Sequence, residues 1–249
     1  MGLFNKIILR LNNFLQKKKR LNKLKHTPAK DLHSGHIDSL ELLELIQSEA
    51  QINVIVDIGA NTGTWTLLAK SIFSNAQIYA FEPLEFCRLE FEKNTKVLDN
   101  INLYLKAVGN ENITSKINLN SFADASSILN ATPLLHSSFQ IKELDKLVIQ
   151  IVKLDDFFKQ EGLLQPDLIK LDIQGYELEA LKGAVMLLSS VKYIIMEVSF
   201  IEYYKNQPLF EEVILFMNSN YFKVKAFGEN LRNGKNLTQV DILFVNHQS

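Results

Sequence analysis

The feature that most constrains the fold is a short apolar run that ends in an acidic residue and a glycine turn, Val54-Ile55-Val56-Asp57-Ile58-Gly59-Ala60-Asn61-Thr62-Gly63. A wholly apolar run of this length is typical of a strand buried on both faces of a parallel sheet. The glycines allow a tight turn, and a helix is predicted to begin near Thr64. In such a strand–turn–helix unit the ligand crevice lies at the carboxyl end of the strand.

The rest of the chain repeats this alternation of apolar runs and amphipathic segments. We expect further strands at 77–81, 101–108, 168–171, 193–198, 222–226 and 240–245, and helices at 38–49, 64–73, 84–98, 176–188 and 209–218. Such alternation predicts an α/β fold with a doubly wound, mostly parallel seven-stranded sheet. The last two strands are expected to be antiparallel partners at one edge. Residues 110–165 interrupt the pattern and are predicted to form an insertion near the mouth of the site.

The glycine turn argues against a dinucleotide cofactor. A dinucleotide site is typified by G-x-G-x-x-G, whereas this chain has Gly59 and Gly63 with no glycine between them. Asp57 would also repel a pyrophosphate at this turn. S-adenosylmethionine carries an ammonium, a carboxylate and a sulfonium but no phosphate, so an acidic residue at the strand end favours this cofactor.

Two further strand ends carry acidic residues. Glu82 follows the second predicted strand, and its carboxylate can accept hydrogen bonds from ribose hydroxyls. Asp172 ends another apolar strand, with Lys170 on the same strand face. Because the carboxyl ends of parallel strands meet at one edge of a sheet, these side chains should converge with Asp57. The alternatives are a solvated carboxylate at Glu82 and a simple salt bridge between Lys170 and Asp172.

Six short motifs mark the strand ends and the insertion: D-I-G-A-N-T-G, F-E-P, A-V-G, D-A-S-S, K-L-D-I-Q-G-Y-E and M-E-V-S-F. Together they resemble the FkbM-type methyltransferases over roughly residues 50–246. The resemblance implies a Rossmann-like class I methyltransferase fold, S-adenosylmethionine as cofactor, and O-methylation of a sugar, glycan or glycolipid. It also implies cofactor contacts from Asp57, Gly59, Ala60, Asn61, Gly63, Glu82, Pro83, Ala107 and Val108. The family pattern often has Glu where this chain has Gln174.

The catalytic candidates are Asp172, Lys170 and Glu197. A hydroxyl acceptor loses its proton at or near methyl transfer, so a base must lie close to it. Asp172 is the candidate base or acceptor-orienting group, with Lys170 keeping it ionised. Glu197, at the end of the next strand, is the alternative base.

Other side chains are secondary candidates. His136 in the insertion could reach the crevice, whereas His33 and His36 are expected in solvent, and the sequence predicts no metal site. Hydroxyl and aromatic side chains predicted on the acceptor side are Ser126, Ser127, Phe200, Tyr203 and Tyr204.

The first 50 residues differ from the rest in charge. Residues 1–30 hold nine Lys and Arg and no acidic residue, so the remainder holds 18 basic and 28 acidic residues. We therefore expect a basic amphipathic helical arm with a lead-in helix at 1–50, and a methyltransferase domain at 51–249. The arm at 1–26 is predicted either to contact an anionic membrane peripherally or to pack on the domain or a homodimer partner. The acidic remainder disfavours nucleic acid as a partner.

Cysteine content and hydropathy bear on the compartment. The single cysteine, Cys87, excludes an intrachain disulfide and favours a reducing environment. No apolar stretch has the roughly 18–20 residues of a transmembrane helix. A cytoplasmic location is therefore expected, with the inner membrane face as the place for peripheral contact.

Two rival functions stay open at this stage. A nucleotide-dependent dehydrogenase or sugar-modifying enzyme would use a similar sheet, but the glycine spacing counts against it. A catalytically inactive cofactor-binding module is favoured only by Gln174.

Overall fold

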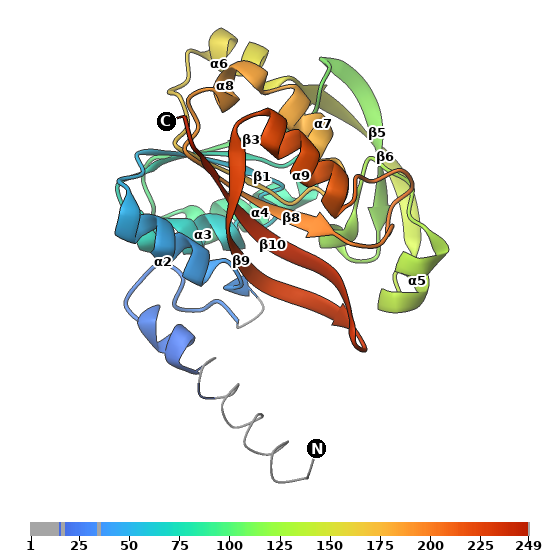
Figure 1. The fold of residues 1–249 in the computed structure, drawn as a ribbon, viewed down its shortest axis with the longest axis horizontal. Coiled ribbons are helices and arrows are strands. Elements are labelled where there is room, and N and C mark those ends of the chain that lie inside the picture. The colour runs from blue at the N-terminus through green and yellow to red at the C-terminus, as the bar shows by residue number, and fades with distance from the viewer. Residues whose placement is uncertain (1–14, 16–17, 34–35, 249) are drawn as a thin grey trace.

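The structure is a computed structural model that describes residues 15, 18–33 and 36–248. Within these residues, seven strands form the central sheet in the order β3-β2-β1-β7-β8-β10-β9 (Figure 1). The strands are β3 (Ile101–Tyr104), β2 (Gln77–Phe81), β1 (Val54–Ile58), β7 (Leu168–Leu171), β8 (Tyr193–Ser199), β10 (Asn236–Asn246) and β9 (Phe222–Asn233). The first five are parallel, and β10 is antiparallel to both of its neighbours. The predicted doubly wound, mostly parallel sheet is confirmed.

Helices cover both faces of this sheet because β1 is apolar on both sides. Val54, Val56 and Ile58 belong to a core shared with α6 (Leu154–Glu161), α7 (Glu177–Lys182), α8 (Val185–Leu188) and α9 (Phe210–Ser219). Ile55 faces the opposite core, where α2 (Leu40–Glu49) and α3 (Thr64–Ile72) pack. The helix α4 (Glu85–Thr95) contacts α3 on that side. The strand order reverses between β2-β1 and β7-β8, so the ligand crevice is expected beside β1 and β7.

The predicted strand at 101–108 is wrong. It is two strands, because a turn in which the Lys106 amide donates to the Tyr104 carbonyl (2.8 Å) interrupts it. The second part, β4 (Ala107–Val108), leaves the central sheet and pairs with β6 (Glu143–Val152). With β5 (Ile113–Asn120) these strands form a smaller sheet in the order β4-β6-β5.

The insertion contains more regular structure than its sequence indicates. The 3₁₀ turn η2 (Ala123–Ala125) and the helix α5 (Pro133–Phe139) lie between β5 and β6, and neither was predicted. The predicted helix at 176–188 is also interrupted, because a Cβ at Gly183 would lie 2.0 Å from the Gly109 carbonyl oxygen. This close approach ends α7 and separates it from α8.

Part of the predicted basic arm packs on the domain. Residues 18–23 are helical, and Leu24 is buried against the core beneath α2. Arg20 pairs with Glu41, and Lys23 pairs with Glu44 (2.6 Å), so two cations of the arm are held by α2. The arm prediction for residues 1–14 lies outside the described residues. In the part of the chain that the structure describes, no helix combines the length and the hydropathy that crossing a bilayer requires.

Candidate active site

A cavity of about 280 Å³ opens at the carboxyl ends of β1, β2 and β7, at the point where the strand order reverses. Seven residues predicted to hold the cofactor line it: Gly59, Ala60, Asn61, Glu82, Pro83, Ala107 and Val108. All three catalytic candidates also line it: Lys170, Asp172 and Glu197. The structure therefore brings most of the predicted site together. Asp57 and Gly63 lie outside the cavity wall that the structure describes.

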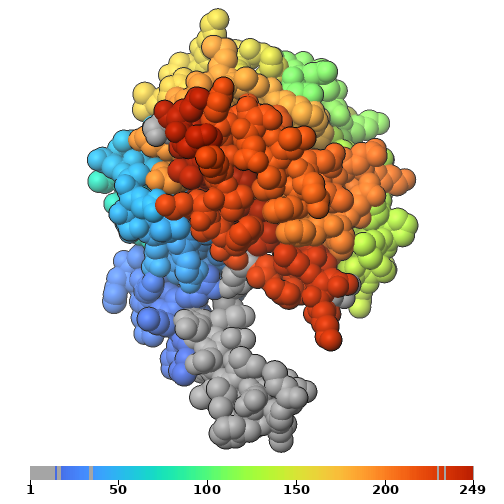
Figure 2. All heavy atoms as spheres, viewed as in Figure 1, coloured from blue at the N-terminus to red at the C-terminus, as the bar shows by residue number. Residues whose placement is uncertain are grey.

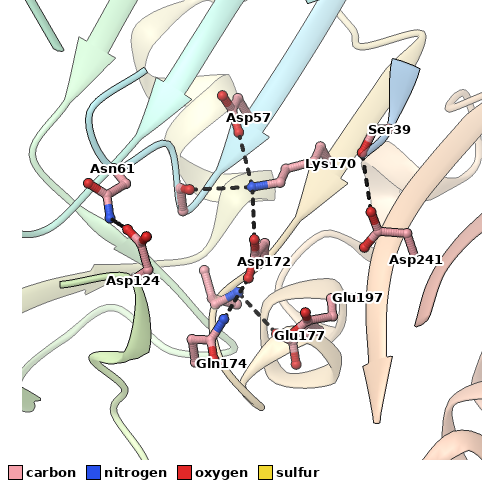
Figure 3. A network of polar contacts seen from close by, with 12 residues as sticks. Ser39, Asp57, Asn61, Asp124, Lys170, Asp172, Gln174, Glu177, Glu197 and Asp241 are labelled. Atoms are coloured by element: carbon pink, nitrogen blue, oxygen red, sulfur yellow. Dashed lines mark hydrogen bonds and ion pairs between the residues drawn. The ribbon is translucent and has the colours of Figure 1, made fainter. Parts of the chain in front are cut away.

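Lys170 lies at the centre of the polar network behind this wall (Figure 3). Its Nζ lies 3.7 Å from Asp57 Oδ1, 3.6 Å from Asp172 Oδ2 and 3.4 Å from the Gly59 carbonyl oxygen. Burial by itself lowers the pKa of Lys170, but the charges of Asp172 and Asp57 outweigh it and hold that pKa above its ordinary value. The side chain is thus a charged ammonium that ties β1 to β7 beneath the glycine turn.

Asp57 supports the glycine turn from behind. Its side chain is fully buried, and the Thr66 hydroxyl donates to its Oδ2 at 2.6 Å. Burial raises the pKa of Asp57, and the charge of Lys170 and the hydrogen bond from Thr66 act in the opposite direction. The partners of Asp57 are therefore protein groups, and its predicted contact with a cofactor remains a prediction.

Gly59 allows the turn to pack against the next strand end. Its φ is +81°, and a Cβ there would lie 2.0 Å from the Asp172 carbonyl oxygen. Gly63 also has a positive φ, of +82°, and a Cβ there would lie 2.9 Å from the ring of Phe91 on α4. Both glycines of the motif are thus required by the packing around the turn.

Glu82 holds the glycine turn from the end of β2. Its Oε2 accepts from the Asn61 amide (3.0 Å), and its Oε1 accepts from the Leu84 amide (2.9 Å). Burial raises the pKa of Glu82 to about 7. The Asn61 side chain in turn donates to Asp124 of the D-A-S-S motif, so the insertion reaches the turn.

The loop after β7 is held by its own motif. Glu177 Oε1 accepts from the amides of Ile173 (3.0 Å) and Gly175 (3.1 Å), and burial raises the pKa of Glu177 to about 7. Gln174 has a φ of +58°, and its Nε2 donates to Asp172 Oδ1 at 2.7 Å. The last Glu of K-L-D-I-Q-G-Y-E thus shapes the loop, and Gln174 orients Asp172.

Glu197 faces the cavity from β8. The Gln239 amide donates to its Oε2 at 2.7 Å, and Asp241 is its register partner on β10. Burial raises the pKa of Glu197 well above its ordinary value, and the charges of Asp172 and Asp241 raise it further. Protonation of this carboxyl group therefore persists at a higher pH than for an exposed Glu.

The residues that close the far side of the cavity were not predicted. His36, Asp38 and Ser39 line it from the segment before α2, and Asp241 lines it from β10. The Ser39 hydroxyl lies 3.3 Å from Asp241 Oδ2 and joins the two segments. His36 was expected in solvent, and it is exposed, but it is also part of this wall. No periodicity in the sequence links these segments, which are about 200 residues apart along the chain.

Ser126 and Ser127 line the cavity, but their hydroxyls contact backbone groups. Ser126 Oγ accepts from the Asn120 amide (3.2 Å), and Ser127 Oγ donates to the Gln174 carbonyl (2.7 Å). In these contacts the serine pair positions the insertion against the Gln174 loop.

The aromatic candidates lie outside this cavity. Tyr203 and Tyr204 are buried with Leu135, and they line a second, adjacent cavity. Phe200 stacks on Phe210 at 4.9 Å. The Nδ1 atom of His136 lies 2.9 Å from the Ile141 carbonyl oxygen, and His136 is not part of either cavity wall in the described structure.

Within residues 15, 18–33 and 36–248, the acidic, histidine and cysteine side chains form no cluster of three or more that could hold a metal ion.

Comparison with known proteins identifies the family of this chain. The family described as "Methyltransferase FkbM domain" matches residues 57–224. The hexuronic acid methyltransferase AglP of Haloferax volcanii is 23% identical over 164 residues, which cover 66% of this chain and 62% of that protein. The 2-O-methyltransferase NoeI of Sinorhizobium fredii is 29% identical over 163 residues, which cover 62% of this chain and 66% of that protein. The chain thus spans less than two thirds of the length of either relative.

Solved structures with a similar fold include methyltransferases. A crystal structure of a putative RNA methyltransferase from Pyrococcus horikoshii aligns with a TM-score of 0.50 and 12% identity, over 93% of this chain and 96% of that one. This likeness concerns the fold alone. The family match covers well over half of the chain, and it confirms the predicted methyltransferase class and its cofactor, S-adenosylmethionine. The chain belongs to the FkbM methyltransferase domain family.

Proposed function

We propose that this protein methylates a hydroxyl group of a neutral, sugar-containing acceptor. The observation that carries the proposal is the shared cavity, in which the glycine turn and Glu82 lie on one side and Asp172 and Glu197 on the other. This arrangement supports a cofactor subsite and an acceptor subsite that meet at the end of β7. The names of the two relatives, a hexuronic acid methyltransferase and a 2-O-methyltransferase, support a sugar hydroxyl as the acceptor.

The residues that line the cavity suit the charges of S-adenosylmethionine. The amides of Gly59, Ala60, Asn61 and Gly63 donate to protein oxygens, so the first amides of α3, which begins at Thr64, are the proposed partners of the cofactor carboxylate. An ionised carboxylate has about four acceptor positions, so Glu82 can accept from ribose hydroxyls while holding Asn61 and Leu84. The acidic wall suits a cofactor that carries an ammonium and a sulfonium. When bound, S-adenosylmethionine supplies a methyl group activated by the positive sulfur.

On the acceptor side, Asp172 is the proposed proton acceptor. Gln174 donates to one of its oxygens and Lys170 lies 3.6 Å from the other, so the carboxylate is held in one orientation. Glu197 is the alternative base, because it lines the same cavity from the end of the neighbouring strand β8. The family pattern often has Glu at position 174, where this chain has Gln. Because Gln174 donates to Asp172 and orients it, the Gln is compatible with an active enzyme and does not favour an inactive binding module.

The charge of the wall supports a neutral acceptor. Among the described residues, four carboxyl groups line the acceptor side of the cavity, and the ammonium of Lys170 lies between Asp57 and Asp172. The four are Asp38, Asp172, Glu197 and Asp241. A sugar that carries its own carboxylate would be repelled here, unlike a neutral sugar. This would distinguish the protein from a hexuronic acid methyltransferase.

The remaining partner proposals concern the N-terminal segment. We propose residues 1–50 as a basic arm and a lead-in helix that precede the domain at 51–249, and peripheral contact with anionic lipid as the use of residues 1–26. The positive charge of 1–30 supports this. Sedimentation with anionic liposomes, with and without residues 1–26, tests it, and equal binding of the two forms would contradict it.

The main proposal is tested by calorimetry followed by a turnover assay. We expect S-adenosylmethionine and S-adenosylhomocysteine to bind the full chain, and NAD to give no heat. Mass spectrometry should then detect methyl transfer to neutral methyl glycosides and less transfer to methyl glucuronide. A folded protein that binds neither sulfur compound would contradict a methyltransferase. Binding without transfer to any sugar would instead support a binding module.

A further inference from the structure

A second cavity of about 370 Å³ lies beside the first, between the insertion and the C-terminal hairpin. Apart from a polar inner edge, its wall is apolar and aromatic. The apolar members are Phe122, Ala125, Leu135, Phe139, Ile141, Tyr203, Tyr204 and Leu231. Such a surface is suited to an alkyl or aryl group.

The two cavities share part of their walls. Asp124, Gln174 and Glu197 line both of them. Gln239, which donates to Glu197, also lines the second cavity. The acidic cavity and the apolar cavity therefore adjoin each other at the three residues that line both. Polar groups at the shared edge and apolar groups beyond it match an acceptor with a hydroxylated end and an apolar end.

Apolar side chains at the rim of the second cavity are unusually open to solvent. Phe122 is 62% exposed and Leu231 is 42% exposed. They belong to the turn before η2 and to the β9–β10 hairpin, whose tip lies beside α5 (Figure 2). Exposed apolar groups that gather around a cavity are a mark of a binding site.

A groove of about 390 Å³ continues the apolar cavity outward. It shares Phe139, Tyr203 and Leu231 with the second cavity and adds Leu134, Ser137, Ser138 and Arg232, so its wall is mixed. The three spaces therefore follow one another from the glycine turn to α5 and the hairpin. An elongated acceptor would fit such a path better than a compact one.

We propose that the second cavity binds an alkyl or aryl group of the methyl acceptor, while the sugar hydroxyl lies near Asp172 and Glu197. The proposal rests on the proposed function and adds the chemical class of the acceptor, an amphipathic glycoside. Since the walls meet at Glu197, the apolar group would also set the position of the sugar relative to the base.

The test compares octyl β-glucopyranoside with methyl β-glucopyranoside in saturation-transfer NMR, using the full chain saturated with S-adenosylhomocysteine. We expect the octyl glycoside to bind about tenfold more tightly or better, with saturation strongest on its alkyl protons. Leu231→Ser and Phe122→Ser should remove most of this preference. The matched controls are Leu215→Ser on α9 and Phe86→Ser on α4, whose side chains are 70% and 51% exposed. Neither residue lines any of the three spaces in the described structure, so both variants should keep the preference for the octyl glycoside.

Several outcomes would overturn the subsite. Equal affinity for the two glycosides would do so, as would an octyl preference that survives both Leu231→Ser and Phe122→Ser. A dimer that Leu231→Ser dissociates in analytical ultracentrifugation would assign the apolar surface to a second copy of the chain. Binding of S-adenosylhomocysteine is measured in every sample, because its loss in the unmodified protein would refute the proposed function itself. An octyl preference without that binding would leave an apolar site that serves no methyltransferase, which also refutes the inference.

Discussion

The ammonium of Lys170 lies 3.7 Å from the fully buried carboxylate of Asp57. The same ammonium lies 3.6 Å from Asp172, which faces the cavity. Lys170 therefore joins a carboxylate that supports the glycine turn to the carboxylate that we propose as the proton acceptor. The two halves of the site share one cation, so its loss should disturb stability and chemistry together.

Replacing this cation should destabilise the fold. We expect Lys170→Met to lower the free energy of unfolding by about 3–5 kcal/mol, because Asp57 would remain buried without a cationic partner. Adding Asp57→Asn should restore part of the loss by removing the buried charge. Urea denaturation measures both. Lys192→Met is the control, because its partner Asp167 lies 2.8 Å away but the Lys192 side chain is 43% exposed, so about 1 kcal/mol or less is expected. Equal losses for the two lysines would contradict this account.

Asp172→Asn should separate chemistry from cofactor binding. The amide keeps an oxygen that can accept from Gln174, but it cannot take up the acceptor's proton. We expect turnover to fall about 100-fold or more, with the affinity for S-adenosylhomocysteine changed by about threefold or less. Turnover assays and calorimetry on the same preparation measure the two effects. If Glu197→Gln abolishes turnover while Asp172→Asn leaves it unchanged, Glu197 is the base.

The glycine turn should tolerate no side chain at its first glycine. Gly59→Ala would place a Cβ 2.0 Å from the Asp172 carbonyl oxygen, at a φ of +81°. We expect a loss of about 3 kcal/mol or more in the free energy of unfolding, from overpacking and backbone strain together. Gly162→Ala is the matched control, because its φ is +63° but a Cβ there would meet no described atom within 4 Å. That variant should lose only about 1 kcal/mol, and a similar loss at both positions would show that strain alone accounts for Gly59.

The buried Glu177 should make stability depend on pH. Burial raises the pKa of its carboxyl group to about 7 from 4.5, so the folded chain holds this proton more strongly than the unfolded chain. The resulting stability is complete below about pH 4.5 and is lost as the pH rises through about 7. Glu177→Gln keeps an acceptor oxygen for the loop but does not titrate.

We therefore expect the unmodified protein to lose roughly 1–3 kcal/mol more than Glu177→Gln between about pH 4.5 and pH 8, measured by urea denaturation at each pH. Glu82 has a similarly raised pKa, so the variant should keep part of the slope. Identical pH profiles for the two proteins would contradict a titrating Glu177.

Local sequence patterns determined the parts of this protein that depend on neighbouring residues. The apolar run before Asp57 specified a buried strand, and Gly59 specified the turn after it, because both follow from backbone and side-chain preferences over a few residues. Glu82 and Asp172 could be placed in one crevice because parallel strands end at the same edge. The strand at 101–108 failed for the converse reason: its apolar pattern does not indicate that β4 pairs with β6 instead of β2.

Only the tertiary structure decided what surrounds these strand ends. His36 and Asp241 line the cavity although they come from opposite ends of the chain, and the second cavity forms where α5 meets the β9–β10 hairpin. Tertiary packing brings these surfaces together, and the periodicity of either segment does not indicate it. The sequence by itself therefore determined the class of the fold and the strand ends that line one side of the cavity. The opposite side, with His36 and Asp241, depends on contacts between distant segments, which local propensity does not encode.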